Sequence, residues 1–191
     1  MKKIIVVFLL ALVCIPLSAC AGTRVYTGPW SGQVIDAESK QPIEGAAVVA
    51  IWYKYYATPA GDVGNYLDTA ETITDKEGKF LLPSKKFLNV PLLRESSAPD
   101  FYIFKPGYGC YPEYMVSPKT KFLKGFFEKP TIIELPKIMD IKIRKNVFSS
   151  IEGTLNIISK NDYKKIKNFI QMRNEEAQFL GHKQRYQNIE E

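Results

Sequence analysis

A cysteine near the start of the chain is the residue whose type and position most clearly indicate chemistry. Two lysines follow the first residue, an apolar run covers residues 4–16, and small residues then lead to this cysteine. This order of basic, apolar and small-residue segments is typical of a secretory signal, whose cleavage site needs small residues because the peptidase pocket is narrow. The expected cleavage leaves a thiol on the first residue of the mature chain. The residues at this site are Leu17, Ser18, Ala19 and Cys20.

The Leu17–Cys20 motif resembles the lipobox of bacterial lipoproteins. The resemblance implies that residues 1–19 are a lipoprotein signal peptide. It also implies that Cys20 is thioether-linked to diacylglycerol and acylated, as with palmitate, on its amino group. Because each buried methylene contributes about 0.8 kcal/mol, several acyl chains anchor a protein stably. A plain secretory signal with a coincidental cysteine is the alternative.

The apolar run is too short to span a membrane, since a transmembrane helix needs about 20 such residues. We therefore expect a chain that is tethered to a membrane without crossing it. In the lipoprotein family, an aspartate directly after the lipidated cysteine retains the protein in the inner membrane. This chain has Ala21 there. The resemblance thus implies a place in the cell envelope, on the periplasmic face of the outer membrane.

Charge and length narrow the possible partners. Removal of 19 residues from 191 leaves 172, which suits one domain with an appendage. The precursor has 26 basic and 20 acidic side chains, and the loss of Lys2 and Lys3 leaves a modest positive excess. Positive charge is concentrated after residue 136, which indicates either a solvated helix face or contact with anionic headgroups. Nucleic acid is not an expected partner of a tethered, exported protein.

Few other residues indicate chemistry. Cys110 is the one cysteine left after removal of the signal and lipidation of Cys20, and we expect it to be buried. The single histidine, His182, lies in a polar tail and cannot supply a histidine-rich metal site. Asp75 and Glu77 offer too few oxygens for calcium. We therefore expect no catalytic residue, no metal and no cofactor, and we expect that the protein is not an enzyme.

The mature chain has the pattern of a β protein that begins at Trp30, after a linker over residues 20–29. Strands are indicated where large and polar residues alternate, or where a short apolar run is rich in β-branched and aromatic residues. The apolar run over residues 46–53 has the composition of a strand buried on both faces. The other predicted strands include residues 30–36, 79–82, 101–104 and 131–135.

Turn and loop residues separate these strands. Asp75 and Gly78 bracket a tight turn in which glycine supplies a positive φ, so the flanking residues predict a hairpin over residues 69–82. Residues 84–99 are predicted to be a loop with apolar islands. Residues 53–71 stay unassigned, because their glycines and proline indicate a loop whereas Tyr55, Tyr56 and Tyr66 are too aromatic for a plain linker.

Three pieces of the β region resemble the carboxypeptidase regulatory-like family. They are the stretch over residues 31–48, the turn over residues 74–80, and the corner over residues 104–108. The resemblance implies a mainly β, transthyretin-like (prealbumin-like) Greek-key β-sandwich over residues 30–138. Members of this family usually act as accessory, binding or structural modules, so the resemblance supplies no catalytic site.

The hydrophobic period becomes helical over residues 139–191, which form a predicted C-terminal α-helical extension. Apolar residues recur at helical spacing from Val147 to Ile158. Ser159 and Asp162 then resemble a capping box that starts a second helix. The apolar stripes would be costly to leave in water, so we expect the sandwich or a partner to cover them.

An aromatic segment is the best candidate for a binding surface, because exposed aromatic faces stack on sugar rings. The alternative is that alternate members of the segment face the core. The candidate residues are Trp52, Tyr53, Tyr55, Tyr56 and Tyr66.

These features together predict a non-enzymatic, lipid-anchored envelope protein whose sandwich binds or scaffolds another envelope component. The expected partners are the membrane, through the lipid anchor, and an envelope protein or glycan. The alternative function is a glycan-binding module that uses the aromatic region from Tyr53 to Tyr66.

Overall fold

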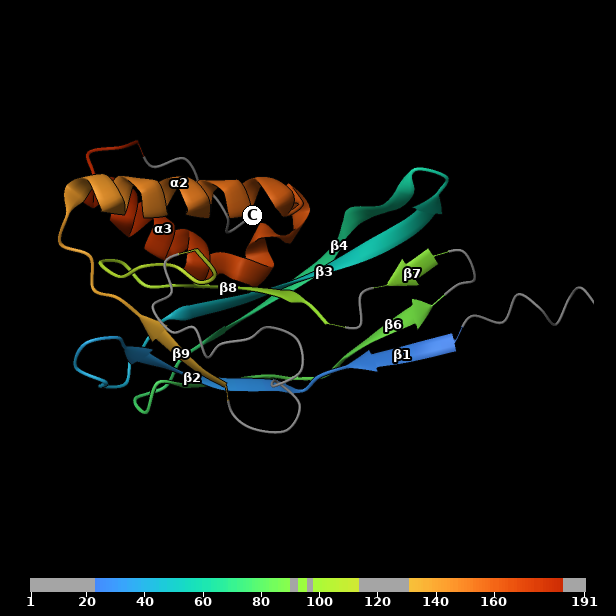
Figure 1. The fold of residues 1–191 in the computed structure, drawn as a ribbon, viewed down its shortest axis with the longest axis horizontal. Helices are drawn as coiled ribbons and strands as arrows, with labels where there is room; N and C mark the ends of the chain where they lie inside the picture. Colours follow the sequence, from blue (N-terminus) through green and yellow to red (C-terminus); the bar gives the residue numbers. More distant parts are fainter. Residues whose placement is uncertain (1–22, 90–92, 96–97, 114–130, 184–191) are drawn as a thin grey trace, which may run out of the picture.

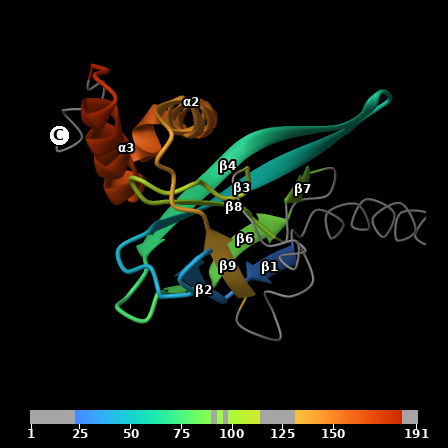
Figure 2. The ribbon, with the colours of Figure 1, turned by 60° about the vertical axis from the view of Figure 1, so that its left-hand side comes forward.

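The structure, a computed structural model, describes residues 23–89, 93–95, 98–113 and 131–183. Figures 1 and 2 show a smaller sheet on one side, a larger sheet in the middle, and helices over the outer face of the larger sheet. The strands are β1 (Thr23–Thr27), β2 (Trp30–Asp36), β3 (Ala47–Thr58), β4 (Gly61–Ile73), β5 (Lys79–Leu82), β6 (Lys85–Asn89), β7 (Leu93–Glu95), β8 (Asp100–Phe104) and β9 (Thr131–Leu135). The helical elements are α2 (Ile141–Ile157), the 3₁₀ helix η1 (Lys160–Ile166) and α3 (Lys167–Phe179).

β3 is the centre of the larger sheet. One edge of β3 pairs with β4, and its other edge pairs with β8 over residues 47–51 and with β7 over residues 54–56. The smaller sheet has the order β5-β2-β9, in which β9 runs parallel to β2. β1 and β6 form a separate antiparallel ribbon.

Both faces of β3 are buried over residues 47–52, because the side chains there alternate between two cores. Val48, Ala50 and Trp52 enter the space between the two sheets. Val49 and Ile51 point toward the helices. All five side chains are fully buried, which explains why the sequence of this strand is apolar without interruption.

Large aromatic and branched side chains fill the core between the sheets. The rings of Trp30 and Phe101 meet edge to face, with centroids 5.7 Å apart. Gly32 leaves room for the ring of Phe80, because a Cβ on residue 32 would lie only 2.8 Å from that ring. The buried members of this core are Trp30, Val34, Ile43, Ala46, Val48, Ala50, Trp52, Phe80, Leu82, Phe101, Ile103, Tyr111, Ile133 and Leu135.

The helices cover the other face of the larger sheet and form a second core. Asp140 caps α2, because its carboxylate accepts hydrogen bonds from the amides of Lys142 and Ile143 at 2.7 and 3.2 Å. From the sequence we expected either the sandwich or a partner to cover the apolar stripes of the helices. The structure shows that the sandwich covers them, because they pack against Ala47, Val49 and Ile51 of β3. The buried members of the second core are Ala47, Val49, Ile51, Phe104, Cys110, Val147, Ile151, Leu155, Ile158, Ile166, Phe169 and Ile170.

A carboxylate from the sheet caps α3. Glu71 of β4 accepts hydrogen bonds from the backbone amides of Asn168 and Phe169 at 3.1 and 2.5 Å. The first turn of a helix leaves such amides free, and the positive end of the helix dipole favours a carboxylate. Burial outweighs these bonds and raises the pKa of Glu71. The start of α3 is thus fixed by a residue of the larger sheet.

Two ion pairs join α2 to α3. Arg144 makes hydrogen bonds of 2.6 and 2.7 Å to Glu176, and Arg173 contacts Glu152 at 2.5 Å. Arg173 and Glu176 are almost completely buried. Because removal of one partner would leave a buried charge without compensation, these pairs constrain how α3 lies against α2.

The sequence-based prediction of a mainly β fold with C-terminal helices is confirmed. The predicted strands over residues 30–36, 101–104 and 131–135 correspond to β2, β8 and β9. Cys110 is buried, as expected. The described helices end at Phe179, and residues 184–191 of the predicted extension lie outside the described residues.

Two predictions, of a linker and of a loop, are wrong. β1 lies inside the predicted linker, and β6 and β7 lie inside the predicted loop over residues 84–99. Residues 53–71, which the sequence left unassigned, are mostly strand, because β3 and β4 continue as one hairpin to a turn at Pro59 and Ala60. Pairing with a neighbouring strand supplies the strand structure that local composition does not indicate.

The predicted hairpin over residues 69–82 and the predicted capping box are also wrong. β4 pairs with β3 whereas β5 pairs with β2, so the Asp75–Gly78 turn connects the two sheets. Ser159 makes no side-chain cap, and Asp162 instead accepts a 2.7 Å hydrogen bond from Tyr66. The second helix therefore starts as the 3₁₀ helix η1 and becomes α-helical at Lys167.

We predict that Gly78→Ala destabilises the protein more than Gly107→Ala does. Both glycines have a positive φ, 69° and 84°. A Cβ on Gly78 would collide with the carbonyl oxygen of Val34 in β2, whereas Gly107 faces open space. Gly107→Ala should lower the free energy of unfolding by about 1–2 kcal/mol, and Gly78→Ala by about 3 kcal/mol or more. Urea unfolding measures both values. Equal losses would contradict the role of this turn in joining the sheets.

Candidate functional site

The predicted lipidation site, Leu17, Ser18, Ala19 and Cys20, lies outside the described residues and remains a prediction. The described fold begins at Thr23, three residues after Cys20. No helix in the described ranges is both long enough and apolar enough to cross a membrane.

Trp52 does not belong to a binding surface, which corrects the sequence-based assignment. Its side chain is fully buried between the sheets, where it donates a 3.4 Å hydrogen bond to the hydroxyl of Thr27. The ring of Phe87 lies beside it, and the ammonium of Lys85 is 4.7 Å from its ring centroid. Trp52 is buried because it lies on the same face of β3 as Val48 and Ala50, which point into the core between the two sheets.

The other four aromatic candidates lie along the β3–β4 hairpin. Tyr53 and Tyr66 pack at the border of the helix-facing core and are half-buried. The ring of Tyr55 is 6.4 Å from that of Tyr53 and covers Gly64, where a Cβ would lie 2.9 Å from Cε1 of the ring. Tyr56, farther along the hairpin, is 37% exposed. The predicted surface is therefore divided between the body of the domain and the hairpin.

Two residues that sequence reasoning missed lie beside Tyr53. β8 pairs with β3 so that Tyr102 is opposite Val49 and Asp100 is opposite Ile51. Tyr102 lies close enough to Tyr53 to help raise the pKa of its hydroxyl, after burial. No local pattern in the sequence indicates this register, which depends on long-range strand pairing. We refer to Tyr53, Tyr55, Tyr102 and Asp100 as the tyrosine–carboxylate group.

The chemistry of the tyrosine–carboxylate group is that of hydrogen bonding and stacking. Burial raises the pKa of Tyr53, Tyr102 and Asp100, and the charge of Asp100 raises the pKa of the two tyrosines further. The hydroxyls therefore stay protonated and able to donate at neutral pH. Within the described part of the chain, no three His, Cys, Asp or Glu side chains gather as they would around a metal ion.

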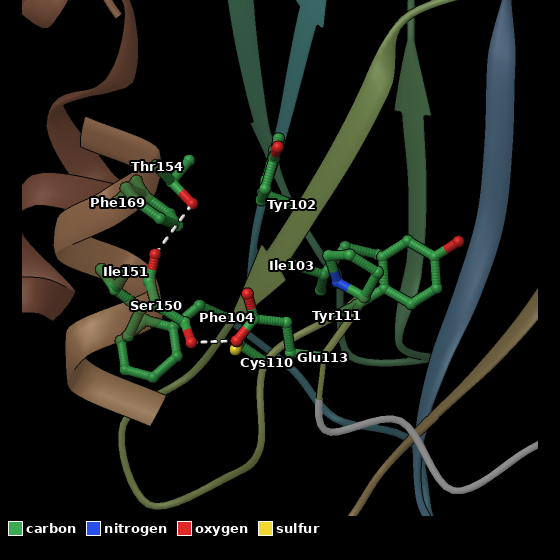
Figure 3. Close-up of a pocket in the computed structure, with 11 residues that line it drawn as sticks. Tyr102, Ile103, Phe104, Cys110, Tyr111, Glu113, Ser150, Ile151, Thr154 and Phe169 are labelled. Atoms are coloured by element: carbon green, nitrogen blue, oxygen red, sulfur yellow. Dashed lines mark hydrogen bonds between the residues drawn. The ribbon is translucent and has the colours of Figure 1, made fainter. Parts of the chain in front are cut away.

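A small recess adjoins Tyr102 between β8 and α2 (Figure 3). Its volume is about 10 Å³, which is room for about one water molecule. Ser150 donates a hydrogen bond to Glu113, and Thr154 donates one of 3.1 Å to the Ser150 carbonyl. A serine hydroxyl becomes a nucleophile when an adjacent base activates it, as histidine does in Ser–His pairs. The single histidine, His182, stacks on Phe148 with ring centroids 5.2 Å apart and does not fill this role.

A chain of ion pairs holds the base of the β3–β4 hairpin. Asp68 of β4 contacts Lys85 at 2.5 Å and Lys165 at 2.6 Å, and Lys165 also contacts Asp162 at 2.7 Å. Burial alone would raise the pKa of Asp68, but hydrogen bonds from the two lysines outweigh it and hold this pKa below its usual value. β4, β6 and η1 are thus joined at one point, and the rest of the hairpin projects beyond it (Figure 1).

A shallow groove of about 270 Å³ lies between α3 and the loop after β8. Its polar side chains already have partners inside the protein. Lys105 donates a 2.5 Å hydrogen bond to the Glu44 carbonyl, and Gln171 donates one of 3.1 Å to Glu175. The groove is therefore a weaker candidate for ligand binding than the tyrosine–carboxylate group.

Exposed apolar side chains also gather where α2 begins and α3 ends. Met139 is 84% exposed, Phe179 is 58% exposed, and the guanidinium of Arg144 lies 3.7 Å from the centroid of the Phe179 ring. Exposed lysines accompany them in the same segments, namely Lys137, Lys142, Lys145 and Lys183. We refer to Met139, Ile141, Ile143 and Phe179 as the distal patch.

Comparisons with known proteins gave no match. No family model matches the chain, and neither a curated protein nor a solved structure matches it.

Proposed function

We propose that this protein is a non-enzymatic, lipid-anchored component of the bacterial cell envelope, whose β-sandwich binds or scaffolds another envelope component. The position of the first strand carries the proposal. β1 begins at Thr23, and the three residues from Cys20 to this point span at most about 10 Å. Lipid on Cys20 would hold the folded domain directly against the bilayer, on the periplasmic face of the outer membrane.

The opposite positions of the two ends of the molecule support the proposal of a partner that binds on the side facing away from the membrane. In Figure 1, β1 starts at one end of the molecule and α2 starts at the opposite end. A bilayer that held Cys20 would leave the distal patch facing away from it. Apolar side chains accompanied by lysines suit a partner with an apolar contact surface and acidic neighbours.

We propose that the sandwich itself is of the carboxypeptidase regulatory-like, transthyretin-like Greek-key type. The positions of the three sequence pieces support this assignment. The first piece covers β2 and the start of β3, the second forms the turn between the sheets, and the third follows β8. Membership of that family would imply an accessory role without catalysis.

A glycan is the second candidate ligand, and the tyrosine–carboxylate group favours it. The half-buried rings of Tyr53 and Tyr55 lie 6.4 Å apart. Asp100 is close enough to Tyr53 to raise its pKa. Stacking rings beside a carboxylate that accepts hydrogen bonds from hydroxyls are the groups that recognise a sugar.

Cys20→Ala should abolish lipidation, because the thioether requires the Cys20 sulfur. Metabolic labelling with an alkyne fatty acid should show loss of the label and accumulation of the uncleaved precursor. Cys14→Ala is the matched control, since Cys14 leaves with the signal and its replacement should change neither label nor cleavage. Persistent labelling of Cys20→Ala would contradict the anchoring proposal.

In-cell photocrosslinking should distinguish an envelope protein from a glycan. A photoreactive aromatic amino acid in place of Ile141 should give a discrete protein adduct, because this position lies in the distal patch. The same amino acid in place of Tyr55 tests the tyrosine–carboxylate group, and Lys76, in the exposed turn between the sheets, is the control position. A saccharide adduct from position 55 with no adduct from position 141 would favour the glycan-binding alternative.

A further inference from the structure

We propose that the tip of the β3–β4 hairpin rests in the headgroup layer of the same bilayer that holds the Cys20 lipid. The inference deepens the proposed function and rests on it. The hairpin tip, residues 55–65, would act as a second, non-covalent membrane contact that sets the orientation of the domain.

The composition of the hairpin tip differs from that of the rest of the surface. Charged residues make up 24% of the chain, yet residues 55–65 contain a single charged side chain, Asp62. The remaining residues are tyrosine, valine, asparagine, threonine, proline, alanine and glycine. Tyrosine is enriched at membrane–water interfaces, where its ring lies at headgroup level and its hydroxyl stays hydrated. One carboxylate is compatible with this depth, because headgroup ammonium groups and water remain there.

The apolar side chains of the tip are exposed as a pair. Tyr56 and Val63 stand opposite each other across the hairpin, and they are 37% and 50% exposed. Every residue from 58 to 65 is exposed. Within the described sheet, β4 pairs only with β3, so the outer edge of residues 61–65 is open. Soluble proteins usually protect such an edge with charge, and a membrane surface would cover it instead.

The tip lies at the end of the molecule where the described chain begins. Figures 1 and 2 both show the hairpin tip at the end of the molecule where β1 starts. Because the chain from Cys20 to Thr23 spans at most about 10 Å, this end must lie near the bilayer if Cys20 is lipidated. The several acyl chains expected on Cys20 would anchor the chain by themselves, so the hairpin contact would orient the domain and would not be needed to hold it at the membrane. This shared end of the molecule is the reason to choose the membrane over a protein or glycan partner, although β6 and β7 lie between β1 and the tip (Figure 1).

The experiment uses the mature lipidated protein, reconstituted in vesicles of phosphatidylethanolamine and phosphatidylglycerol. An environment-sensitive fluorophore is attached to Ala60→Cys at the tip, and to Lys76→Cys in the turn that follows the other end of β4 as the control. Both positions are exposed, and protein without an added cysteine reports any labelling of buried Cys110. The proposal predicts a blue shift and quenching by doxyl-labelled lipid at position 60, and neither at position 76.

Val63→Asp supplies a second variant, which should remove the shift and quenching at position 60 while leaving lipidation and the melting temperature unchanged. Equal responses at positions 60 and 76 in protein that floats with the vesicles would overturn the hairpin contact and leave the anchor intact. Protein that carries no lipid label and does not float would overturn the anchor itself, and the hairpin inference with it.

Discussion

The rest of the structure depends on the burial of the first half of β3, residues 47–52, on both of its faces. A strand in this position must satisfy two cores at once, because each successive side chain enters a different one. Ala50 and Trp52 require the second sheet to cover them, whereas Val49 and Ile51 require the helices. Burial of each large side chain is worth about 1.5–3 kcal/mol relative to leaving it in water, so neither layer can be removed without exposing apolar surface.

This constraint also determines which surfaces remain for function. One face of the larger sheet is covered by the smaller sheet and the other by helices fixed through Glu71 and the ion pairs of Arg144 and Arg173. Partly exposed aromatic and apolar groups then lie at the β8 edge, at the hairpin tip and at the distal patch. Leu81 and Ile132 are also exposed, on the outer side of the smaller sheet. The distal patch and the hairpin tip lie at opposite ends of the domain, so a lipid at one end would leave the other end accessible to a partner.

Much of the fold could be predicted from the sequence, because its main strands carry a local signal. β2 shows alternation and β3 a continuous apolar run, and both patterns follow directly from burial. β1, β6 and β7 are short and owe their strand structure to pairing, so local composition did not reveal them. The cap of α3 by Glu71 joins residues 97 positions apart in the chain, which no local motif encodes. The alternation of β3 did contain the signal that places Trp52 in the core, since its parity matches that of Val48 and Ala50.

Native-state hydrogen exchange on the intact mature protein tests most directly whether the helices and sheets form one folded unit. The account predicts that the slowest amides of α2 and α3, near Leu155 and Ile170, exchange at the same rate as those of Val49 and Ile51 in β3. Equal rates would mean that all of them exchange only through global unfolding. Helix amides that exchange orders of magnitude faster, while β3 stays protected, would show that the helices open independently and would contradict the shared core.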